Sequence, residues 1–308
     1  MSLLVVGTVA FDSIETPFGK VDKVIGGAAT YICWAASYYY HNIRLVSVIG
    51  DDWPMDELKR LQKRGVDTAG LQSRKGEKSF FWAGKYHNDM NTRDTLTTDL
   101  NVLTDFDPVL PESYKDSKYI MLGNLTPDVQ IRVLDQLTSK PKLVALDTMN
   151  FWMDIAMPSL MKVLKKIDIL TINDEEARQL SGEHSLVKAS QIIMKMGPKY
   201  LVIKKGEHGA LLFHKDSIFF APALPLQDVV DPTGAGDTFA GGFMGYLAQS
   251  GAATYHNMKR AMIYGSAMAS FCVEDFSLSK VQNLTDDLIK ERLNQFVQLV
   301  KFNLKVKA

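Results

Sequence analysis

Cysteine is scarce in this sequence, and its scarcity excludes two kinds of protein. Only two cysteines occur among the 308 residues, Cys33 and Cys272, and both stand in apolar segments with a helical pattern. A disulfide scaffold or a cysteine-ligated metal centre needs more thiols, so we expect two buried thiols in a reducing compartment. The six histidines are scattered without an H-x-x-x-H pair, and no G-x-S-x-G stretch occurs. Neither a zinc site nor a serine hydrolase is therefore indicated.

The sequence also lacks an excess of charge and a long apolar run. Lysine and arginine together number 35, aspartate and glutamate also number 35, and the formal net charge is zero. Without a basic excess, nucleic acid and anionic membrane surfaces are not indicated as partners. No apolar run reaches the length of a membrane span, and the first residues resemble a strand rather than a signal peptide. We expect a cytoplasmic protein that binds neither nucleic acid nor membranes.

Six short, nearly continuous apolar runs alternate with amphipathic segments along the chain. Strands that are covered on both faces have this character, and strand–helix–strand repetition is typical of a parallel sheet with helices on both sides. With 46% hydrophobic residues, the chain can bury a full core. We therefore expect a three-layer α/β/α fold with a mainly parallel central sheet, whose strands occupy Leu3–Val9, Leu45–Gly50, Tyr119–Gly123, Leu143–Asp147, Ile167–Ile172 and Tyr200–Gly206.

Two stretches interrupt this alternation, Glu15–Ala29 and Ser73–Leu100. The second is rich in aromatic residues, threonine and lysine and has no helical pattern, so both are predicted to form antiparallel strands outside the main sheet. They are either two surface hairpins or a small β lid over a cleft. Ligands of open α/β sheets bind at the carboxyl ends of the strands. The candidate binding loops are therefore those that follow Gly7, Gly123, Asp147, Asn173 and Gly206.

The stretch Val229–Ala248, VVDPTGAGDTFAGGFMGYLA, places Gly-Ala-Gly directly before an aspartate and a predicted helix that begins near Asp237. The first N–H groups of a helix have no internal partner and carry partial positive charge. Backbone amides of Gly234, Ala235 and Gly236 would thus form an anion-binding cup. An ionised Asp237 beside a bound phosphate could take the proton from an attacking hydroxyl.

The simpler alternative is a strand–turn–helix connection in which Asp237 only caps the helix. The stretch contains neither the G-x-x-x-x-G-K-[ST] pattern of a P-loop nor the G-x-G-x-x-G pattern of a dinucleotide site.

The segment DPTGAGDTFAGGF closely resembles the C-terminal motif D-T-x-G-A-G-D-x-F of the PfkB, or ribokinase-like, carbohydrate kinases. GGAATYICWAAS, VIGDD, NDEEA and KKGEHG resemble further motifs of that family and occur in the same order, over nearly the whole chain. The resemblance implies one ribokinase-like kinase domain over residues 1–308. Its lid would comprise segments at about 11–25 and 73–101.

On the acceptor side, the resemblance implies that Asp12 binds substrate hydroxyls and that Gly26 and Gly27 let the sugar ring lie against the backbone. Asp12 could otherwise be an exposed loop carboxylate, and the glycines a turn. Ribokinases carry Lys and Asn in G-G-K-G-A-N, whereas this chain has G-G-A-A-T-Y. The difference disfavours ribose and is compatible with a larger or flatter substrate, including a nucleoside that could stack on Tyr31 or on a lid aromatic such as Phe81 or Trp82.

On the nucleotide side, Asn173 and Glu176 form the N-x-x-E motif, which in the family helps to hold Mg²⁺ through water; the same spacing is that of a helix capping box. DTMNFW resembles the D-x-N-x-R stretch, so Asn150 would face the phosphates, but the arginine is missing. Lys204 and Arg93 are the candidates for the absent cation. Lys204 could instead be a solvated strand end, and Arg93, also a candidate substrate-binding residue, an exposed lid residue.

The resemblance also implies residues that surround ATP more loosely. The helix that carries the residues expected near the adenine could equally be a packed helix that does not contact the nucleotide. These residues are the loop glycines Gly206 and Gly209, the adenine-side residues Gly265 and Ser266, and Asp231 and Thr233, which resemble residues that bind a monovalent cation such as K⁺.

Together these features predict an ATP- and Mg²⁺-dependent transfer of the γ-phosphate to a hydroxyl of a sugar or sugar-like molecule. A nucleoside kinase of the same family is the first alternative, and a non-catalytic sugar or nucleotide sensor is the second. A kinase of related fold that acts on a vitamin-like alcohol is disfavoured by the Gly26-Gly27 motif and the lid. The resemblance further implies a possible homodimer through the lid.

Overall fold

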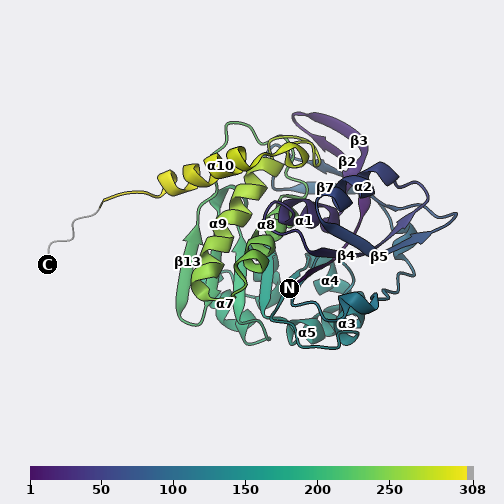
Figure 1. Ribbon diagram of the computed structural model, residues 1–308. Helices are drawn as coiled ribbons and strands as arrows, with labels where there is room; N and C mark the ends of the chain where they lie inside the picture. Colours follow the sequence, from purple (N-terminus) through teal and green to yellow (C-terminus); the bar gives the residue numbers. More distant parts are fainter. Residues whose placement is uncertain (304–308) are drawn as a thin grey trace.

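A nine-stranded sheet, here sheet A, forms the centre of the computed structural model, which describes residues 1–303 (Figure 1). Residues 304–308, part of the expected domain, lie outside the described residues. Seven neighbouring strands are parallel, and the last two form an antiparallel hairpin at one edge. In spatial order the strands are β13 (Ser217–Ala221), β12 (Ala210–His214), β11 (Tyr200–Lys204), β10 (Ile169–Asn173), β9 (Leu143–Asp147), β8 (Tyr119–Leu122), β1 (Leu3–Val6), β4 (Ile43–Gly50) and β5 (Val66–Arg74).

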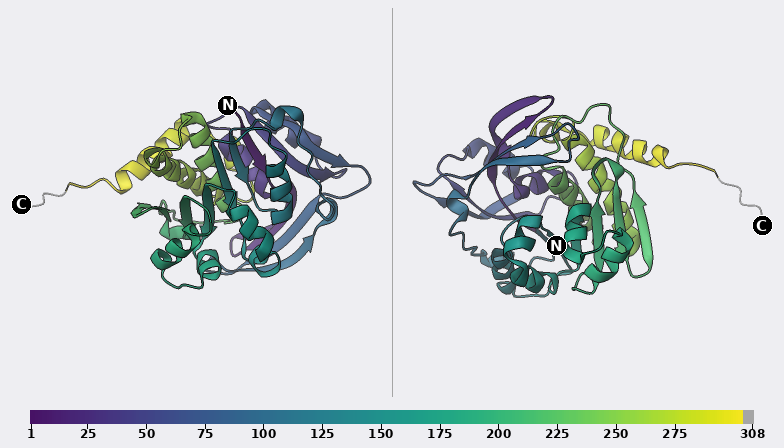
Figure 2. Two further views of the ribbon diagram at one scale, coloured as in Figure 1. Left: turned by 90° about the horizontal axis from the view of Figure 1, so that it is seen from below. Right: turned by 180° about the vertical axis from the view of Figure 1, so that it is seen from behind.

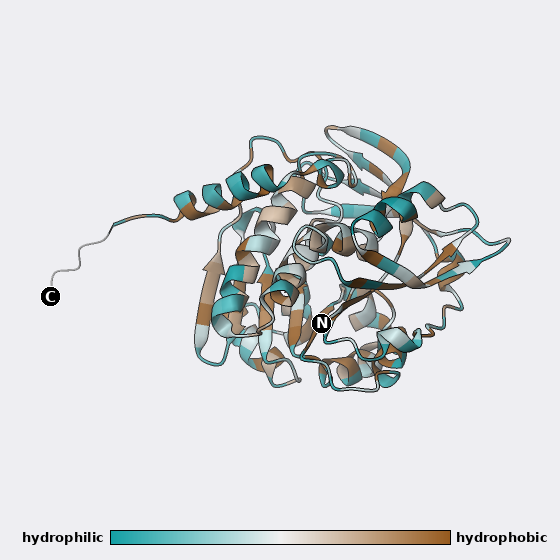
Figure 3. Ribbon diagram, viewed as in Figure 1, coloured by the Kyte–Doolittle hydropathy of each residue, from teal (hydrophilic) through white to brown (hydrophobic). Residues whose placement is uncertain are grey.

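Helices cover both faces of sheet A, which confirms the predicted three-layer fold. Alternate residues of each strand enter different cores: Leu3 and Val5 pack on one side, Leu4 and Val6 on the other. This double burial explains the continuous apolar runs, which colour the central strands in Figure 3. One side carries α1 (Ala28–Ala36), α2 (Met55–Lys63), α8 (Ala235–Ser250), α9 (Tyr255–Cys272) and α10 (Asp286–Leu299); the other carries α3 (Pro127–Asp135), α4 (Asn150–Ile155), α5 (Met157–Leu164), α6 (Asp174–Ser181) and α7 (Leu186–Met194).

A second, four-stranded sheet, here sheet B, stands beside the first. Its order is β3 (Gly19–Gly26), β2 (Ala10–Thr16), β6 (Phe80–Tyr86) and β7 (Arg93–Asp99). Both views of Figure 2 show it, in purple and blue, on the side away from the projecting end of α10. The two expected hairpin segments thus join in one sheet. Two details of the expectation were wrong: residues 73–74 belong to β5 of sheet A, and β2 pairs with β6 in parallel.

Sheet B is tied to the segment that precedes α8. Thr16 Oγ1 donates to the carbonyl of Val230 at 2.9 Å, and Ser277 Oγ donates to the carbonyl of Ile25 at 2.5 Å. Residues far apart in sequence therefore meet where the chain turns toward α8, and sheet B is placed over that turn.

Helix α8 packs closely on α1 along its middle. A Cβ atom at Gly241 would stand 2.5 Å from the carbonyl oxygen of Ile32, and one at Gly245 would stand 2.8 Å from the Cα of Ala36. Only glycine permits this approach. The small residues after Asp237 thus serve helix packing, as the sequence predicts.

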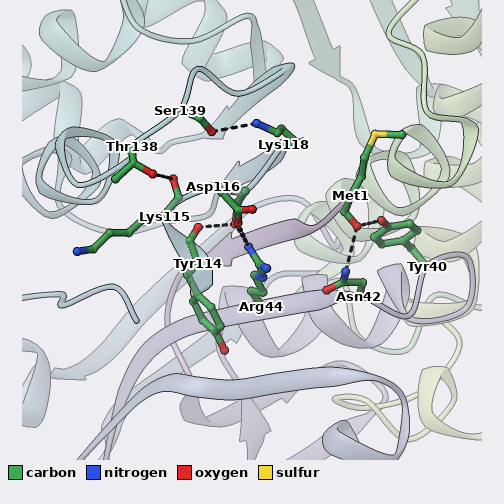
Figure 4. A network of polar contacts seen from close by, with 11 residues as sticks. Met1, Tyr40, Asn42, Arg44, Tyr114, Lys115, Asp116, Lys118, Thr138 and Ser139 are labelled. Carbon is green, nitrogen blue, oxygen red and sulfur yellow. Dashed lines mark hydrogen bonds and ion pairs between the residues drawn. The ribbon is translucent and has the colours of Figure 1, made fainter. Parts of the chain in front are cut away.

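Polar contacts join the segments at the amino-terminal edge of sheet A (Figure 4). The carbonyl of Met1 accepts hydrogen bonds from Tyr40 and Asn42, and Arg44 Nη1 lies 2.8 Å from Asp116 Oδ1. Among the helices of residues 1–303, none combines the length and apolarity that a membrane crossing requires. Both cysteines are free and buried, as predicted.

Gly241→Ala should lower the free energy of unfolding by at least about 2 kcal/mol, because the added methyl group must displace backbone of α1. Urea unfolding measures this change. Gly236→Ala on the same helix is the control, since its Cβ would meet only the flexible end of Lys204 at 3.0 Å. Equal stability of the two variants would contradict the packing described for α8 and α1.

Candidate active site

The N-terminus of α8 opens at the carboxyl edge of sheet A. Its N-cap is Gly234, whose φ of 74° and ψ of 0° are left-handed, and no side chain caps the helix. The helix therefore begins at Ala235, two residues before the predicted start, and Asp237 lies in its first turn. The alternative of Asp237 as an N-cap is wrong. Residues Gly234–Asp237 are all partly exposed, so a ligand can reach this end of the helix.

The backbone amides at this end are mostly unpaired. Ala235 N–H donates to the carbonyl of Pro232 at 3.2 Å, whereas within residues 1–303 the N–H groups of Gly234, Gly236 and Asp237 have no acceptor. Unpaired N–H groups at a helix start attract anions. Of the three predicted amides, that of Ala235 is thus occupied, and that of Asp237 is available in addition.

The ring of Tyr31 packs against Gly234. A Cβ atom at Gly234 would stand 2.4 Å from Tyr31 Cζ, so the tyrosine ring lies directly against the glycine. Tyr31 is 1% exposed, and no face of its ring is open to a ligand. The prediction that a base could stack on Tyr31 is therefore wrong, because α1 is buried and its side chain fills the space under the turn.

Lys204 lies at the end of β11 and faces the same turn. Its Nζ lies 2.6 Å from Asp147 Oδ2 and 3.0 Å from where a Cβ of Gly236 would stand. Thr171 Oγ1 donates to the same carboxylate oxygen at 2.8 Å. Asp147 therefore holds the ammonium group beside the helix start. The sequence predicted no role for Asp147, although its position at the end of a strand was a usable signal.

Burial and neighbouring charges shift the pKa values of the ionisable side chains at this edge of sheet A. Burial, and then the charge of Asp147, raise the pKa of Asp237 to about 7, while Lys204 and Arg93 act in the opposite direction. For Lys204, burial lowers the pKa, but Asp147 and Glu176 outweigh it and the net shift is upward. An aspartate with a pKa near neutrality and an open face is suited to accept a proton.

Asp12 lies on β2, at the inner face of sheet B. It is 5% exposed, and burial followed by the charges of Asp231 and Asp237 raises its pKa to about 7. A Cβ at Gly26 would stand 2.0 Å from Asp12 Oδ2, so the carboxylate rests on the glycine. Gly27 has a φ of 91° and starts α1. The structure therefore brings Asp12, Gly26 and Gly27 together.

An aromatic platform adjoins Asp12. Trp82 is the residue paired with Asp12 in the parallel β2–β6 ladder, so both side chains lie on one face. The indole folds over Gly84, where a Cβ would stand 2.1 Å from Trp82 Cη2, and the residue is partly exposed. Phe81, its neighbour on β6, faces the other side and packs against a hydrophobic core.

Asn173 and Glu176 form a complete capping box at the start of α6. Asn173 N–H donates to Glu176 Oε2 at 2.7 Å, and Glu176 N–H donates to Asn173 Oδ1 at 2.8 Å. Burial raises the pKa of Glu176 to about 7. Within residues 1–303, no group of three or more His, Cys, Asp or Glu side chains could hold a metal ion. A Mg²⁺ ion that keeps its waters and the phosphate oxygens of ATP needs no such group.

The other predicted residues lie around this centre. Gly206 and Gly209 have φ of 54° and 79° in the turn after β11. Gly265 packs against the carbonyl of Phe239, where a Cβ would stand at 2.8 Å, and Ser266 is 9% exposed. Both thus lie in the α8–α9 interface, and contact with adenine stays a prediction.

Asp231 is fully buried. Its carboxylate accepts N–H groups of Thr233 at 2.8 Å and of Ser277 at 3.0 Å. Asn150 donates a hydrogen bond to Gln179 on α6, and its orientation toward the phosphates stays a prediction.

Comparisons with known proteins concern the family and the fold of the chain. The family model for pfkB family carbohydrate kinases matches residues 2–283. The chain is 30% identical over 248 residues to a cytidine kinase of Thermococcus kodakarensis, covering 79% of this chain and 87% of the relative. It is 25% identical over 303 residues to a nucleoside kinase of Methanothermobacter thermautotrophicus, covering 89% of each. It is also 24% identical over 323 residues to an inositol 3-kinase of Arabidopsis thaliana, covering 94% and 80%.

Solved structures share the fold. An aminoimidazole riboside kinase from Salmonella enterica, complexed with aminoimidazole riboside and an ATP analogue, superimposes with a TM-score of 0.75 at 20% identity, over 95% of this chain and 100% of that chain. A nucleoside kinase from Burkholderia thailandensis in complex with inosine gives 0.76 at 18% identity, over 96% and 99%. At these identities the likeness concerns the fold.

Asp237→Asn should stabilise the protein more at pH 8 than at pH 5.5. The folded-state pKa of Asp237 is raised from 3.8 to about 7, so the ionised carboxylate destabilises the native state increasingly as the pH rises through this range. The amide variant removes that charge. Thermal unfolding at both pH values measures the effect, with Asp216→Asn in the exposed β12–β13 turn as the control. An equal gain at both pH values, or none, would contradict the raised pKa.

Proposed function

This chain belongs to the pfkB family of carbohydrate kinases, and from that premise we propose how its residues divide the work of phosphoryl transfer. The chain is an ATP-dependent kinase that phosphorylates a hydroxyl group of a sugar or nucleoside. We propose that residues 1–308 form one kinase domain, with sheet B as its lid. The observation that carries the assignment of roles is the open N-terminus of α8, with Asp237 and Lys204 beside it.

Asp237 is proposed as the general base. It accepts the proton of the attacking hydroxyl, while the unpaired amides of the α8 N-terminus stabilise the negative charge on the transferring phosphoryl group. Gly234 and Gly236 are required here because the phosphate approaches the backbone closely. The ammonium of Lys204, fixed by Asp147 at 2.6 Å, adds a positive charge on the same side.

The nucleotide occupies the turn that contains Gly206 and Gly209 in this proposal. Asn173 and Glu176 would hold Mg²⁺ through water, and the bound ion would neutralise part of the phosphate charge. Gly265 and Ser266 lie toward the adenine, and a monovalent cation such as K⁺ would be held near Asp231 and Thr233. The carboxylate of Asp231 already accepts two backbone N–H groups, so carbonyl oxygens of that turn would supply most cation ligands.

The acceptor binds between Asp12 and Asp237 in this proposal, with Gly26 and Gly27 under it. Among acceptors, two observations favour a nucleoside over a free sugar. Trp82 adjoins Asp12 on the same face of sheet B and offers a stacking surface for a base. The chain also lacks the Lys and Asn that follow the paired glycines in ribokinases. The named activities of two relatives, a cytidine kinase and a nucleoside kinase, point the same way.

A non-catalytic sensor is disfavoured because a binding protein has no need of a partly exposed carboxylate with a raised pKa beside an anion site.

We further propose that two copies associate through sheet B. Every residue of its edge strand β7 is exposed, and Leu96 on that strand is 59% exposed. The two buried free thiols suit work in a reducing cytoplasm.

Asp237→Asn should fold as the parent does and lose about 10²- to 10⁴-fold in kcat, the usual contribution of a general base. Coupled ADP release with pentoses, hexoses, keto-deoxy acids and nucleosides, with and without K⁺, gives the measurement and identifies the acceptor. For the parent protein, kcat/KM should fall as the pH drops below about 7, because the free enzyme then binds a proton at Asp237. Near-parental turnover of the variant would remove Asp237 from this role.

Asp12→Ala should raise KM for the acceptor at least about tenfold and leave KM for ATP unchanged, because the carboxylate binds acceptor hydroxyls only. Trp82→Leu should impair nucleosides more than free sugars, since it removes the surface on which a base would stack. Steady-state kinetics with both substrate classes distinguish these effects. A change in KM for ATP with Asp12→Ala would mean that the two substrate positions are assigned the wrong way round.

A further inference from the structure

The turn between β6 and β7, residues 87–92, has a defined internal structure. Asp89 organises it: its Oδ1 accepts the N–H groups of Asn91 at 3.1 Å and Thr92 at 2.9 Å, and its Oδ2 accepts Thr92 Oγ1 at 2.6 Å. The N–H of His87 donates to the carbonyl of Thr92 at 2.9 Å. A turn held this firmly can place a side chain at a fixed point.

That side chain is Asn91, and the point is the nucleotide turn. A Cβ at Gly206 would stand 2.8 Å from Asn91 Oδ1. The tip of sheet B thus rests on the turn after β11, although the two segments belong to different sheets. Sheet B therefore extends from the acceptor position at Asp12 to the proposed nucleotide position.

Arg93 lies on the inner face of the same hairpin. It is paired with Tyr86 across the β6–β7 ladder, so both side chains leave the same face. The hydroxyl of Tyr86 lies 3.3 Å from Thr233 Oγ1, directly before Gly234. The guanidinium of Arg93 lies over the ring of Trp82, 5.9 Å from its centroid, and its charge lowers the pKa of Asp237 in the first turn of α8.

The carboxylates around the N-terminus of α8 outnumber Lys204, so a second cation is expected there. Three carboxylates, those of Asp147, Glu176 and Asp237, surround Lys204, and Asp147 already pairs with it. A triphosphate brought to this point meets mostly negative charge. Burial raises the pKa of Asp237 and of Glu176, and the charge of Arg93 lowers both. Arg93 thus acts on this group electrostatically even though its own side chain is exposed.

We propose that Arg93 binds the terminal phosphates of the nucleotide rather than the acceptor, and that seating of Asn91 on the turn at Gly206 delivers it there. The inference rests on the proposed function and adds a link between the two substrates. The sheet that covers the acceptor also supplies the charge that the triphosphate needs. Closure over the acceptor and completion of the phosphate site are then one event.

The test measures binding without turnover. Arg93→Ala should weaken binding of a non-hydrolysable β,γ-methylene ATP analogue with Mg²⁺ at least about tenfold, the size expected for a lost charge-assisted hydrogen bond. Binding of ADP should change less than twofold, since ADP lacks the terminal phosphate, and KM for the acceptor should stay within twofold. Isothermal calorimetry and steady-state kinetics give these values. Arg93→Lys should retain part of the analogue affinity.

A matched control is available on the neighbouring strand. Lys85 is a cation of β6 that faces the outside and pairs with Glu15 at 2.6 Å, so Lys85→Ala should leave all three values unchanged. Asn91→Ala should shift analogue binding in the same direction as Arg93→Ala but by less, because it loosens the seat without removing the charge. Circular dichroism and thermal unfolding establish that each variant is folded.

The outcomes distinguish a failure of the proposal for Arg93 from a failure of the proposed function. If Arg93→Ala weakens acceptor binding and spares the analogue, or changes neither, the phosphate role of Arg93 is overturned while the kinase assignment stands. If Asn91→Ala has no effect on analogue binding, the seating on Gly206 is overturned. If the parent protein binds neither nucleotide and releases no ADP with any acceptor, the proposed function itself fails and this inference fails with it.

Discussion

The ion pair between Lys204 and Asp147, 2.6 Å long, is the interaction on which the site depends. It holds a positive charge at the start of α8, among carboxylates that burial would otherwise drive to their neutral forms. The pKa values of Asp12, Glu176 and Asp237 are each raised to about 7, in each case with burial as the largest cause. A base must be ionised to act, so the cations near Asp237 keep part of it in the working form. The arrangement costs stability, as poised active sites commonly do.

The extent of sheet B depends on the parallel pairing of β2 with β6. Because β2 and β6 run parallel, the residues of β6 continue along the direction set by β2, past Asp12 toward the segment before α8. Trp82 then adjoins Asp12, Tyr86 contacts Thr233 at 3.3 Å, and the hairpin tip arrives at the turn after β11. A single twisted sheet can therefore face both substrates of a transfer reaction.

Much of this organisation could be predicted from the sequence, and the failures have identifiable causes. The buried parallel strands, the capping box at Asn173–Glu176 and the glycine-rich start of α8 were predictable because local patterns determine them. Strand β5 was missed because its burial is mixed along its length, unlike that of a central strand, and the β12–β13 hairpin because its edge strand is largely exposed. The buried position of Tyr31 depends on contact with Gly234, and Asp147 acts through its ion pair with Lys204 and its charge near Asp237. Contacts between residues so distant in sequence leave no local pattern.

A base that can deprotonate an alcohol can also deprotonate water, and this sets a condition on the site. Asp237 is partly exposed and lies beside the proposed position of the transferring phosphoryl group, so water that reached it would lead to ATP hydrolysis. Charge stabilisation and water exclusion must therefore be completed together. A lid that carried only acceptor contacts could exclude water without regard to the nucleotide. A lid that also contributes positive charge to the phosphates closes most favourably when both substrates are present, because only then are its polar and charged groups all paired. If the nucleotide binds at the turn after β11 as proposed, the extension of sheet B to that turn meets this condition with the residues of one hairpin.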